Sequence, residues 1–164
     1  MKAALPTKES PYKVTYAVHK LLDSNQSTEF IGFLNLKSVS TEGDAQRSLA
    51  LPEHLTLPAA AATTTLTIEI GYAFLPKAWG QGYATESVKA AFEACRATRA
   101  FWAPYSKLYV RAIVIDLNPA SLKVMDKTGI PKTGIYEWTG EAIFHGGEWR
   151  DHTSLHIYGG YLFE

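Results

Sequence analysis

The sequence predicts a mixed α/β fold: a mostly antiparallel twisted sheet with one central parallel crossover and flanking helices. Residues 66–74 alternate apolar and other side chains, the period of a strand buried on one face. Residues 84–96 then space their apolar side chains along one helical face. Residues 106–115 follow as a largely apolar strand, typical of one covered on both faces. A strand, a helix and a strand at this spacing form a right-handed parallel crossover.

Two segments before this unit predict an antiparallel pair of strands. Residues 12–20 alternate cleanly, residues 23–27 have turn chemistry, and residues 29–37 fit the partner strand. Gly32 inside the second strand predicts a bulge or a close backbone approach. The first strand has no predicted neighbour on its other side, so we expect an exposed edge protected by prolines and charged residues or by a second subunit.

After the crossover the sequence predicts a short helix. Asn118 is a suitable N-cap, Pro119 fits the first helical position, and Gly129 fits the stop. Residues 134–138 and 141–158 then predict closing antiparallel strands with a tight glycine turn at 146–147.

Residues 38–65 interrupt this regular pattern. The segment contains glycine, two prolines and an alanine and threonine tract, and only residues 48–57 favour a helical turn or two. We interpret it as a long insertion, either disordered or packed at a dimer contact. We expect residues 1–164 to form a single domain around it.

Composition excludes several classes of function. Hydrophobic residues make up 46% of the chain, and 16 basic residues balance 16 acidic ones, so we expect no direct nucleic-acid partner. The single cysteine, Cys95, falls on the apolar helix face and suits a reducing compartment. The N-terminus lacks a signal-peptide pattern, and no segment approaches the length of a membrane span. We therefore expect a cytoplasmic protein without a membrane partner.

The glycine turn at Gly80 and Gly82 is the strongest candidate for a binding site. Such a turn feeds the predicted helix, whose first N–H groups and dipole attract phosphate. A Walker loop is excluded because Tyr83 and Ala84 replace its lysine and hydroxyl residue. A dinucleotide fingerprint fits in part: Thr85 replaces its third glycine, while Asp116 ends the next strand. An oxidoreductase that binds NAD therefore stays a minor alternative.

The stretch KAWGQGYATESVKA resembles the acetyl-CoA pyrophosphate loop of the GNAT-type N-acetyltransferases. It is most similar to the branch that includes the ribosomal-protein N-terminal alanine acetyltransferases. The segments LNPASLKVMDKTGI and GGEWRD resemble later motifs of that branch, in the same order. Lys77 departs from the arginine or glutamine of the loop pattern and keeps the donor but not the planar fork. The family's N-terminal strand and helices, whose loop covers the acceptor site, have no counterpart in this pattern.

The resemblance implies acetyl-CoA as co-substrate, no metal, and a primary amine as acceptor, either a peptide N-terminus or a small molecule. It implies that main-chain groups of Phe74 and Leu75 pair with pantetheine between two splayed parallel strands. The implied coenzyme-binding residues are Phe74, Leu75, Trp79, Gly80, Gln81, Gly82, Tyr83, Ala84, Thr85, Asn118 and Lys127. For Asn118 and Lys127 the alternatives are plain capping and a favourable contact with the helix dipole.

Glu69 and Ser121 are the candidate catalytic residues. Glu69 lies mid-strand and is either a solvated carboxylate or a general base, because an ammonium must lose a proton before it attacks a thioester. By resemblance, Ser121 faces the thioester sulfur, where a hydroxyl can protonate the leaving thiolate; Tyr136 and Tyr158 are alternative donors.

The predicted function is acetyl transfer by direct attack of the amine on the thioester, without a covalent enzyme intermediate. The alternative is a catalytically inactive GNAT-like module that binds acyl-CoA or a protein, because the segment that covers the acceptor site has no counterpart. A homodimer would protect the exposed edge strand. Three histidines, His145, His152 and His156, flank the C-terminal turn but lack the spaced cysteine or acidic partners of a metal site.

Overall fold

The computed structural model describes residues 12–22, 27–39, 51–57, 59–145 and 148–164. Its strands and helices follow in chain order: β1 (Lys13–Leu22), β2 (Ser27–Ser38), η2 (Glu53–Leu55), η3 (Ala59–Thr63), β3 (Thr65–Phe74), η4 (Pro76–Ala78), α1 (Tyr83–Ala97), η5 (Arg99–Trp102), β4 (Lys107–Ile115), α2 (Pro119–Thr128), β5 (Lys132–His145) and β6 (Glu148–Phe163).

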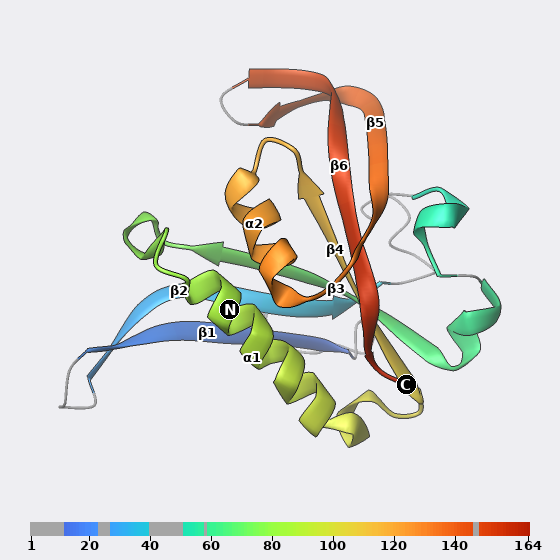
Figure 1. Cartoon of the computed structure of the whole chain (residues 1–164), viewed down its shortest axis with the longest axis horizontal. Coiled ribbons are helices and arrows are strands. Elements are labelled where there is room, and N and C mark those ends of the chain that lie inside the picture. The colour runs from blue at the N-terminus through green and yellow to red at the C-terminus, as the bar shows by residue number, and fades with distance from the viewer. Residues whose placement is uncertain (1–11, 23–26, 40–50, 58, 146–147) are drawn as a thin grey trace.

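Within the described residues, six strands form one sheet in the order β1-β2-β3-β4-β6-β5 (Figure 1). β3 and β4 pair in parallel, and α1 connects them, so the predicted crossover is confirmed. The other described ladders are antiparallel. This mixed topology is not the doubly wound parallel sheet that a dinucleotide-binding oxidoreductase needs.

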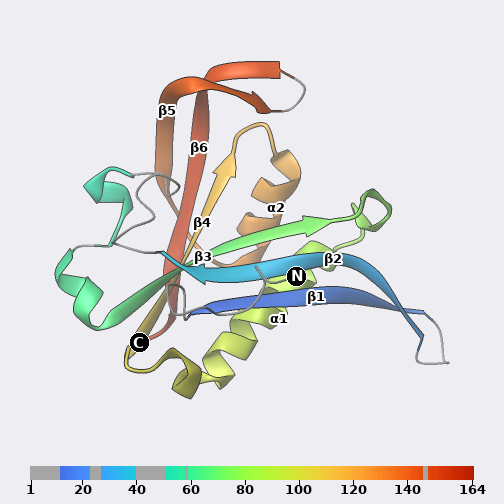
Figure 2. The ribbon, with the colours of Figure 1, turned by 180° about the vertical axis from the view of Figure 1, so that it is seen from behind.

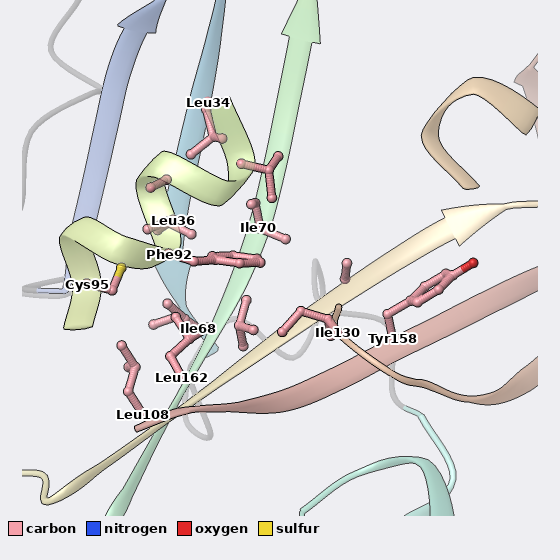
Figure 3. Close-up of a cluster of buried hydrophobic side chains, with 14 of the residues drawn as sticks. Leu34, Leu36, Ile68, Ile70, Phe92, Cys95, Leu108, Ile130, Tyr158 and Leu162 are labelled. Atoms are coloured by element: carbon pink, nitrogen blue, oxygen red, sulfur yellow. The ribbon is translucent and has the colours of Figure 1, made fainter. Parts of the chain in front are cut away.

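Both α-helices of the described chain cover the same face of the sheet (Figures 1 and 2). The core lies between the helices and this face of the sheet, where alternate residues of β2 and β3 such as Leu34, Leu36 and Ile68 are buried. From α1, Phe92 and Cys95 reach down onto these strands (Figure 3). These contacts hold α1 against the sheet, and they thereby fix the position of its N-terminus relative to β3.

β2 shows both of the alternatives that Gly32 predicted. The β1–β2 register shifts opposite this residue, between Val18 and His19, which marks a bulge. A Cβ atom at Gly32 would lie 2.5 Å from the carbonyl oxygen of Ala73, so β2 and β3 approach each other closely there. β2 thus supports β3 up to its C-terminal end, where Gly32 pairs with Phe74.

Part of the predicted insertion packs onto the domain. Residues 53–55 and 59–63 form the short 3-10 helices η2 and η3, and residues 40–50 and 58 lie outside the described residues. Leu55 is buried, and a Cβ atom at Gly134 would lie 2.4 Å from its Cδ2 atom. The described part of the insertion is therefore anchored on β5 by the chain's own contacts, which differs from the expectation of disorder.

The C-terminal strands are longer than the sequence pattern predicted. β5 runs without a break through residues 139–140, where the prediction separated two strands, and the predicted turn at 146–147 lies outside the described residues. β5 and β6 extend past the rest of the sheet as a hairpin (Figure 1). None of the described helices is long and apolar enough to cross a membrane.

Candidate functional site

The parallel ladder between β3 and β4 ends before either strand does. Its last paired residues are Glu69 and Arg111, whereas β3 continues to Phe74 and β4 to Ile115. Beyond this point each strand pairs only with its outer neighbour, β2 or β6. The sheet is thus split at its centre, as the resemblance implied, and backbone groups on the inner sides of the split are available to a ligand.

The turn after β3 brings a helix N-terminus to this split. Gly80 and Gly82 adopt positive φ angles of 72° and 87°, which glycine adopts without strain. The Glu86 N–H makes the first helical bond, to the Gly82 carbonyl, so the amides of Tyr83, Ala84 and Thr85 precede the ladder. No side chain of the described residues caps this end. The geometry is that of an anion site, with free N–H groups at the positive end of the dipole.

A second helix begins on the opposite side of the split. Asn118 caps α2, its Oδ1 accepting the N–H of Ser121 at 3.0 Å, and Pro119 occupies the first turn. The αL glycine Gly129 ends the helix, so both predicted boundaries are confirmed. The cap satisfies the amide of Ser121 and leaves its hydroxyl for other contacts.

A cavity of about 800 Å³ lies between the two helix starts and the end of β3. Among its lining residues there are two lysines, Lys123 and Lys127, and no acidic side chain. Together with the helix N-termini, this charge distribution favours an anionic ligand. The lining residues are Tyr72, Ala73, Phe74, Ala78, Trp79, Gly80, Gly82, Tyr83, Ala84, Thr85, Asn118, Pro119, Ala120, Ser121, Lys123, Val124 and Lys127.

Most of the sequence-predicted site residues meet at this cavity, and three do not line it. Gln81 turns back, and its Nε2 donates to the Lys77 carbonyl at 2.7 Å. The Leu75 N–H donates to the Ile31 carbonyl at 2.8 Å, so it is used within the sheet. Because successive N–H groups along a strand point to opposite sides, the amide of Phe74 points toward the split.

Glu69, the third of these residues, lies at the closed end of the split. Its Oε2 accepts two hydrogen bonds from Arg111, from Nε at 3.1 Å and from a terminal nitrogen at 2.7 Å. The arginine side chain is 9% exposed and the glutamate side chain 43%. Glu69 alternates with the core residues of β3 and therefore faces away from the helices. Glu69 therefore lies at the end of the β3–β4 ladder, on the face of the sheet opposite the cavity.

The loop between β3 and α1 is held by its own side chains. Trp79 is 66% exposed, lines the cavity, and donates from Nε1 to the Phe74 carbonyl at 2.8 Å. Lys77, which departs from the family pattern, forms an ion pair with Glu29 of β2. Lys77 thus fastens the loop to the neighbouring strand and does not line the cavity.

The structure adds a tyrosine that the sequence reasoning did not select. Tyr72 lines the cavity from β3, and its buried hydroxyl oxygen has no hydrogen-bond partner among the described residues. Burial raises the pKa of Tyr72, and the side chain of Ser121 partly opposes this rise. These observations agree if the two hydroxyls are neighbours without being aligned for a hydrogen bond. The strand alternation placed Tyr72 among core residues, and nothing in the sequence indicated an unpaired hydroxyl.

The two tyrosines considered as proton donors lie elsewhere. Tyr158 of β6 is buried in the core beside α2, and its hydroxyl donates to Asp126 at 3.0 Å (Figure 3). Burial and this carboxylate raise the pKa of Tyr158 to about 12. Tyr136 lies on β5 and, like Tyr158, does not line the cavity.

Neither the metal nor the dinucleotide alternative gains support from the described residues. Asp116, the acid of the dinucleotide pattern, accepts a hydrogen bond from Thr153 at 3.1 Å and does not line the cavity. His152 pairs with Asp151, and the side chain of His145 lies outside what the structure describes. No group of three or more potential ligands is placed to hold a metal ion in the described ranges.

Comparison with protein-family models matches residues 2–130 to the acetyltransferase (GNAT) domain. A search of curated protein sequences found no match. Among solved structures, the fold is similar to a GNAT-family acetyltransferase from Bacillus anthracis, with 21% identity and a TM-score of 0.52. The match covers 90% of this chain and 66% of that one, so this chain spans just under two-thirds of that relative's length.

Two further solved structures are similar at the level of the fold. One is a mutant form of the spermidine/spermine N-acetyltransferase SpeG from Vibrio cholerae, with 14% identity and a TM-score of 0.52 over 92% of this chain and 67% of that one. The other is NAA60 from Arabidopsis thaliana in complex with a bisubstrate analogue, with 14% identity and a TM-score of 0.56 over 91% and 76%.

Proposed function

Because the chain belongs to the GNAT acetyltransferase domain family, we propose that it transfers an acetyl group from acetyl-CoA to a primary amine. The observation that carries the proposal is the split between β3 and β4. It opens into a cavity that two helix starts and two lysines make suitable for an anionic ligand. Coenzyme A has this character, since a pyrophosphate and a 3′-phosphate are attached to a long amide-containing arm.

We assign the coenzyme's groups by matching their chemistry to the lining. The pyrophosphate lies on the free amides at the start of α1, where Gly80 and Gly82 leave open space. The pantetheine arm enters the split and pairs with the backbone of Phe74, as an added strand would. Trp79 offers an exposed ring at the same wall, and Lys127 on α2 is the partner for the 3′-phosphate.

The proposed reaction is a direct attack on the thioester. Glu69, directly or through water, takes a proton from the substrate ammonium; its Oε1 is the oxygen that does not bind Arg111. The nitrogen then bonds to the carbonyl carbon, the C–S bond breaks, and its electron pair goes to sulfur. Ser121 gives its hydroxyl proton to sulfur and recovers the second proton of the attacking nitrogen. The Phe74 amide polarises the carbonyl oxygen.

The two faces of the split suggest where each substrate binds. The cavity lies on the helix-covered face, and Glu69 faces the other side of the sheet. The acceptor therefore approaches from the face opposite the helices. A peptide N-terminus is our first choice of acceptor, from the motifs of the ribosomal-protein alanine acetyltransferase branch. A small-molecule amine is the second, in line with the named substrates of SpeG.

The test is calorimetric titration of the purified chain with CoA, with dephospho-CoA, which lacks the 3′-phosphate, and with NAD. We expect CoA to bind best and NAD not to bind. Lys127→Ala should weaken CoA binding several-fold and abolish the preference over dephospho-CoA, because it removes one phosphate contact. Lys89→Ala, on an exposed position of α1 away from the cavity, is the control. Absence of CoA binding at millimolar concentration would end the proposal.

A second candidate function is a module that binds acyl-CoA without transfer. The position of Glu69 favours it, because this candidate base is paired with Arg111 and does not line the cavity. Acetyl transfer to spermidine or to peptides with N-terminal alanine or serine distinguishes the two candidates.

We further propose a single cytoplasmic domain that forms a homodimer through β1. The single, buried Cys95 is consistent with a reducing compartment, and β1 is an edge strand whose Leu21 is 73% exposed.

A further inference from the structure

One polar group in the wall of the cavity is buried without a hydrogen bond to the described residues. The hydroxyl oxygen of Tyr72 is buried and makes no hydrogen bond to the described residues. Buried polar groups are nearly always hydrogen-bonded, because an unpaired one loses its water without compensation. An exception in the wall of a binding cavity points to a bond that forms only when the cavity is filled.

The neighbours of Tyr72 limit what that bond can be. Among the described residues, the polar side chains of Ser121 and Tyr158 lie near enough to interact with this hydroxyl. Tyr158 already donates its proton to Asp126, on the side of the core. Ser121 lines the cavity and is fixed by its N–H bond to the Asn118 cap. Of the two, only Ser121 connects Tyr72 to a ligand.

A hydrogen bond from Tyr72 to Ser121 would decide where the single hydroxyl proton of Ser121 points. Ser121 Oγ carries one proton and two acceptor positions, and the proton can rotate toward any acceptor nearby. When Oγ accepts a hydrogen bond from Tyr72, its own proton must point elsewhere. A phenol is a stronger acid than an aliphatic alcohol, so Tyr72 is the better hydrogen-bond donor of the two hydroxyls.

We infer that Tyr72 is a positioning residue: its hydroxyl donates to Ser121 Oγ when a thioester or thiol fills the cavity, and this directs the Ser121 proton to the sulfur. The inference rests on the proposed function, because it requires the sulfur of CoA to lie beside Ser121. Because its hydroxyl oxygen is buried, Tyr72 itself does not touch the reacting atoms.

The test measures the thiol pKa of bound CoA, which needs neither an acceptor nor turnover. Thiolate absorbance in the ultraviolet is followed against pH for CoA on the wild type, Y72F, S121A and the double variant, with the ligand-free protein subtracted. The chain's own thiol does not interfere, because burial raises the pKa of Cys95 to about 12. Y16F is the control: Tyr16 is a half-buried tyrosine of β1 outside this cavity.

We expect the wild type to lower the thiol pKa of bound CoA by about one unit, the effect of one hydrogen bond to a charged acceptor. Y72F and S121A should each lose most of this shift, the double variant should lose no more than either, and Y16F should behave as the wild type. Ser121→Thr keeps the hydroxyl and should keep the shift. Thermal unfolding of Y72F should not be lowered, because the variant removes a buried atom without a partner.

Three results would overturn the inference. A wild-type thiol pKa in Y72F would mean that Tyr72 does not influence the sulfur. Losses that add in the double variant would mean that Tyr72 acts on the sulfur directly. A lower unfolding temperature of Y72F would mean that its hydroxyl has a structural partner. Failure of the wild type to bind CoA is a different outcome, since it would end the proposed function instead.

Discussion

Two independent reasons favour glycine at position 82: its backbone conformation, and the open space that the proposed ligand needs there. Its φ of 87° favours glycine, and the space around a Cβ atom built there is empty within 4 Å. This empty space lies over the first free amides of α1, where we place the pyrophosphate. Any side chain at this position therefore both strains the backbone and occupies the proposed ligand volume.

The matched pair Gly82→Ala and Gly129→Ala separates these two effects. Gly129 ends α2 with a similar φ of 81° and a similarly open surrounding, but it does not line the cavity. Each alanine should lower the free energy of unfolding by about 1–2 kcal/mol, the cost of the left-handed conformation. Only Gly82→Ala should also weaken CoA binding, by about tenfold or more. Equal CoA affinities of the two variants would contradict the phosphate assignment.

At the scale of single residues, the sequence predicts a role correctly where that role depends only on the residue's own backbone and its near neighbours in the chain. The cap at Asn118 and the turn glycines are examples, because their function depends on their own backbone. It missed Tyr72 and Lys123, which line the cavity. Their roles depend on which residues of distant elements face them, and a single sequence does not contain that information.

At the scale of elements, the end of the β3–β4 ladder depends on one ion pair. Arg111 is buried, and Glu69 is its acidic partner among the described residues. Removing that carboxylate leaves the buried guanidinium without its counter-ion. Water replaces the carboxylate in part, because the Glu69 side chain is 43% exposed. The pair thus holds the two strands together at the residue where they begin to separate.

Glu69→Gln should therefore have two separable effects. We expect a loss of about 1–3 kcal/mol in the free energy of unfolding, from the weakened pair, and a loss of acetyl transfer, from the removed base. Adding Arg111→Met should restore much of the stability, because the buried charge is gone, but should not restore activity. Denaturant unfolding and initial rates measure the two effects. Recovery of activity in the double variant would show that Glu69 has only a structural role.

The elements themselves were largely predictable, because periodicity, turn residues and caps act locally. The crossover, the β1–β2 pair and α2 follow the predicted ranges within a few residues. The insertion was less predictable. Leu55 packs against Gly134, which lies far along the chain, and composition alone indicated only a loop. The length of β5 was also missed, since its exposed positions show no clean alternation.

At the scale of the whole molecule, a buried thiol and a buried phenol make the free energy of unfolding depend on pH. Burial raises the pKa of the Cys95 thiol from 9.0 to about 12. Above pH 9 the unfolded chain releases this proton while the folded chain keeps it, so the folded state loses stability as pH rises. The loss is about 1.4 kcal/mol for each pH unit between the two values.

Urea unfolding between pH 8 and pH 11 checks this expectation. The stability of the wild type should fall with pH, and Cys95→Ala should fall less steeply, even if its stability at pH 8 is lower. Tyr158, with a pKa raised to about 12, adds to the slope in both proteins. Identical slopes for the two proteins would mean that Cys95 titrates as it does in the unfolded chain.

The split sheet also bears on how acceptor preference can change. β3 and β4 separate beyond Glu69 and Arg111, and in the proposed function the donor and the amine reach this split from opposite faces of the sheet. Substitutions at Phe33, an exposed residue of β2 that does not line the cavity, alter the surroundings of an incoming amine. The glycine turn and the lysines of α2 lie on the other side and are untouched by such changes. Selectivity for the amine can thus drift or be engineered while the donor's affinity stays constant.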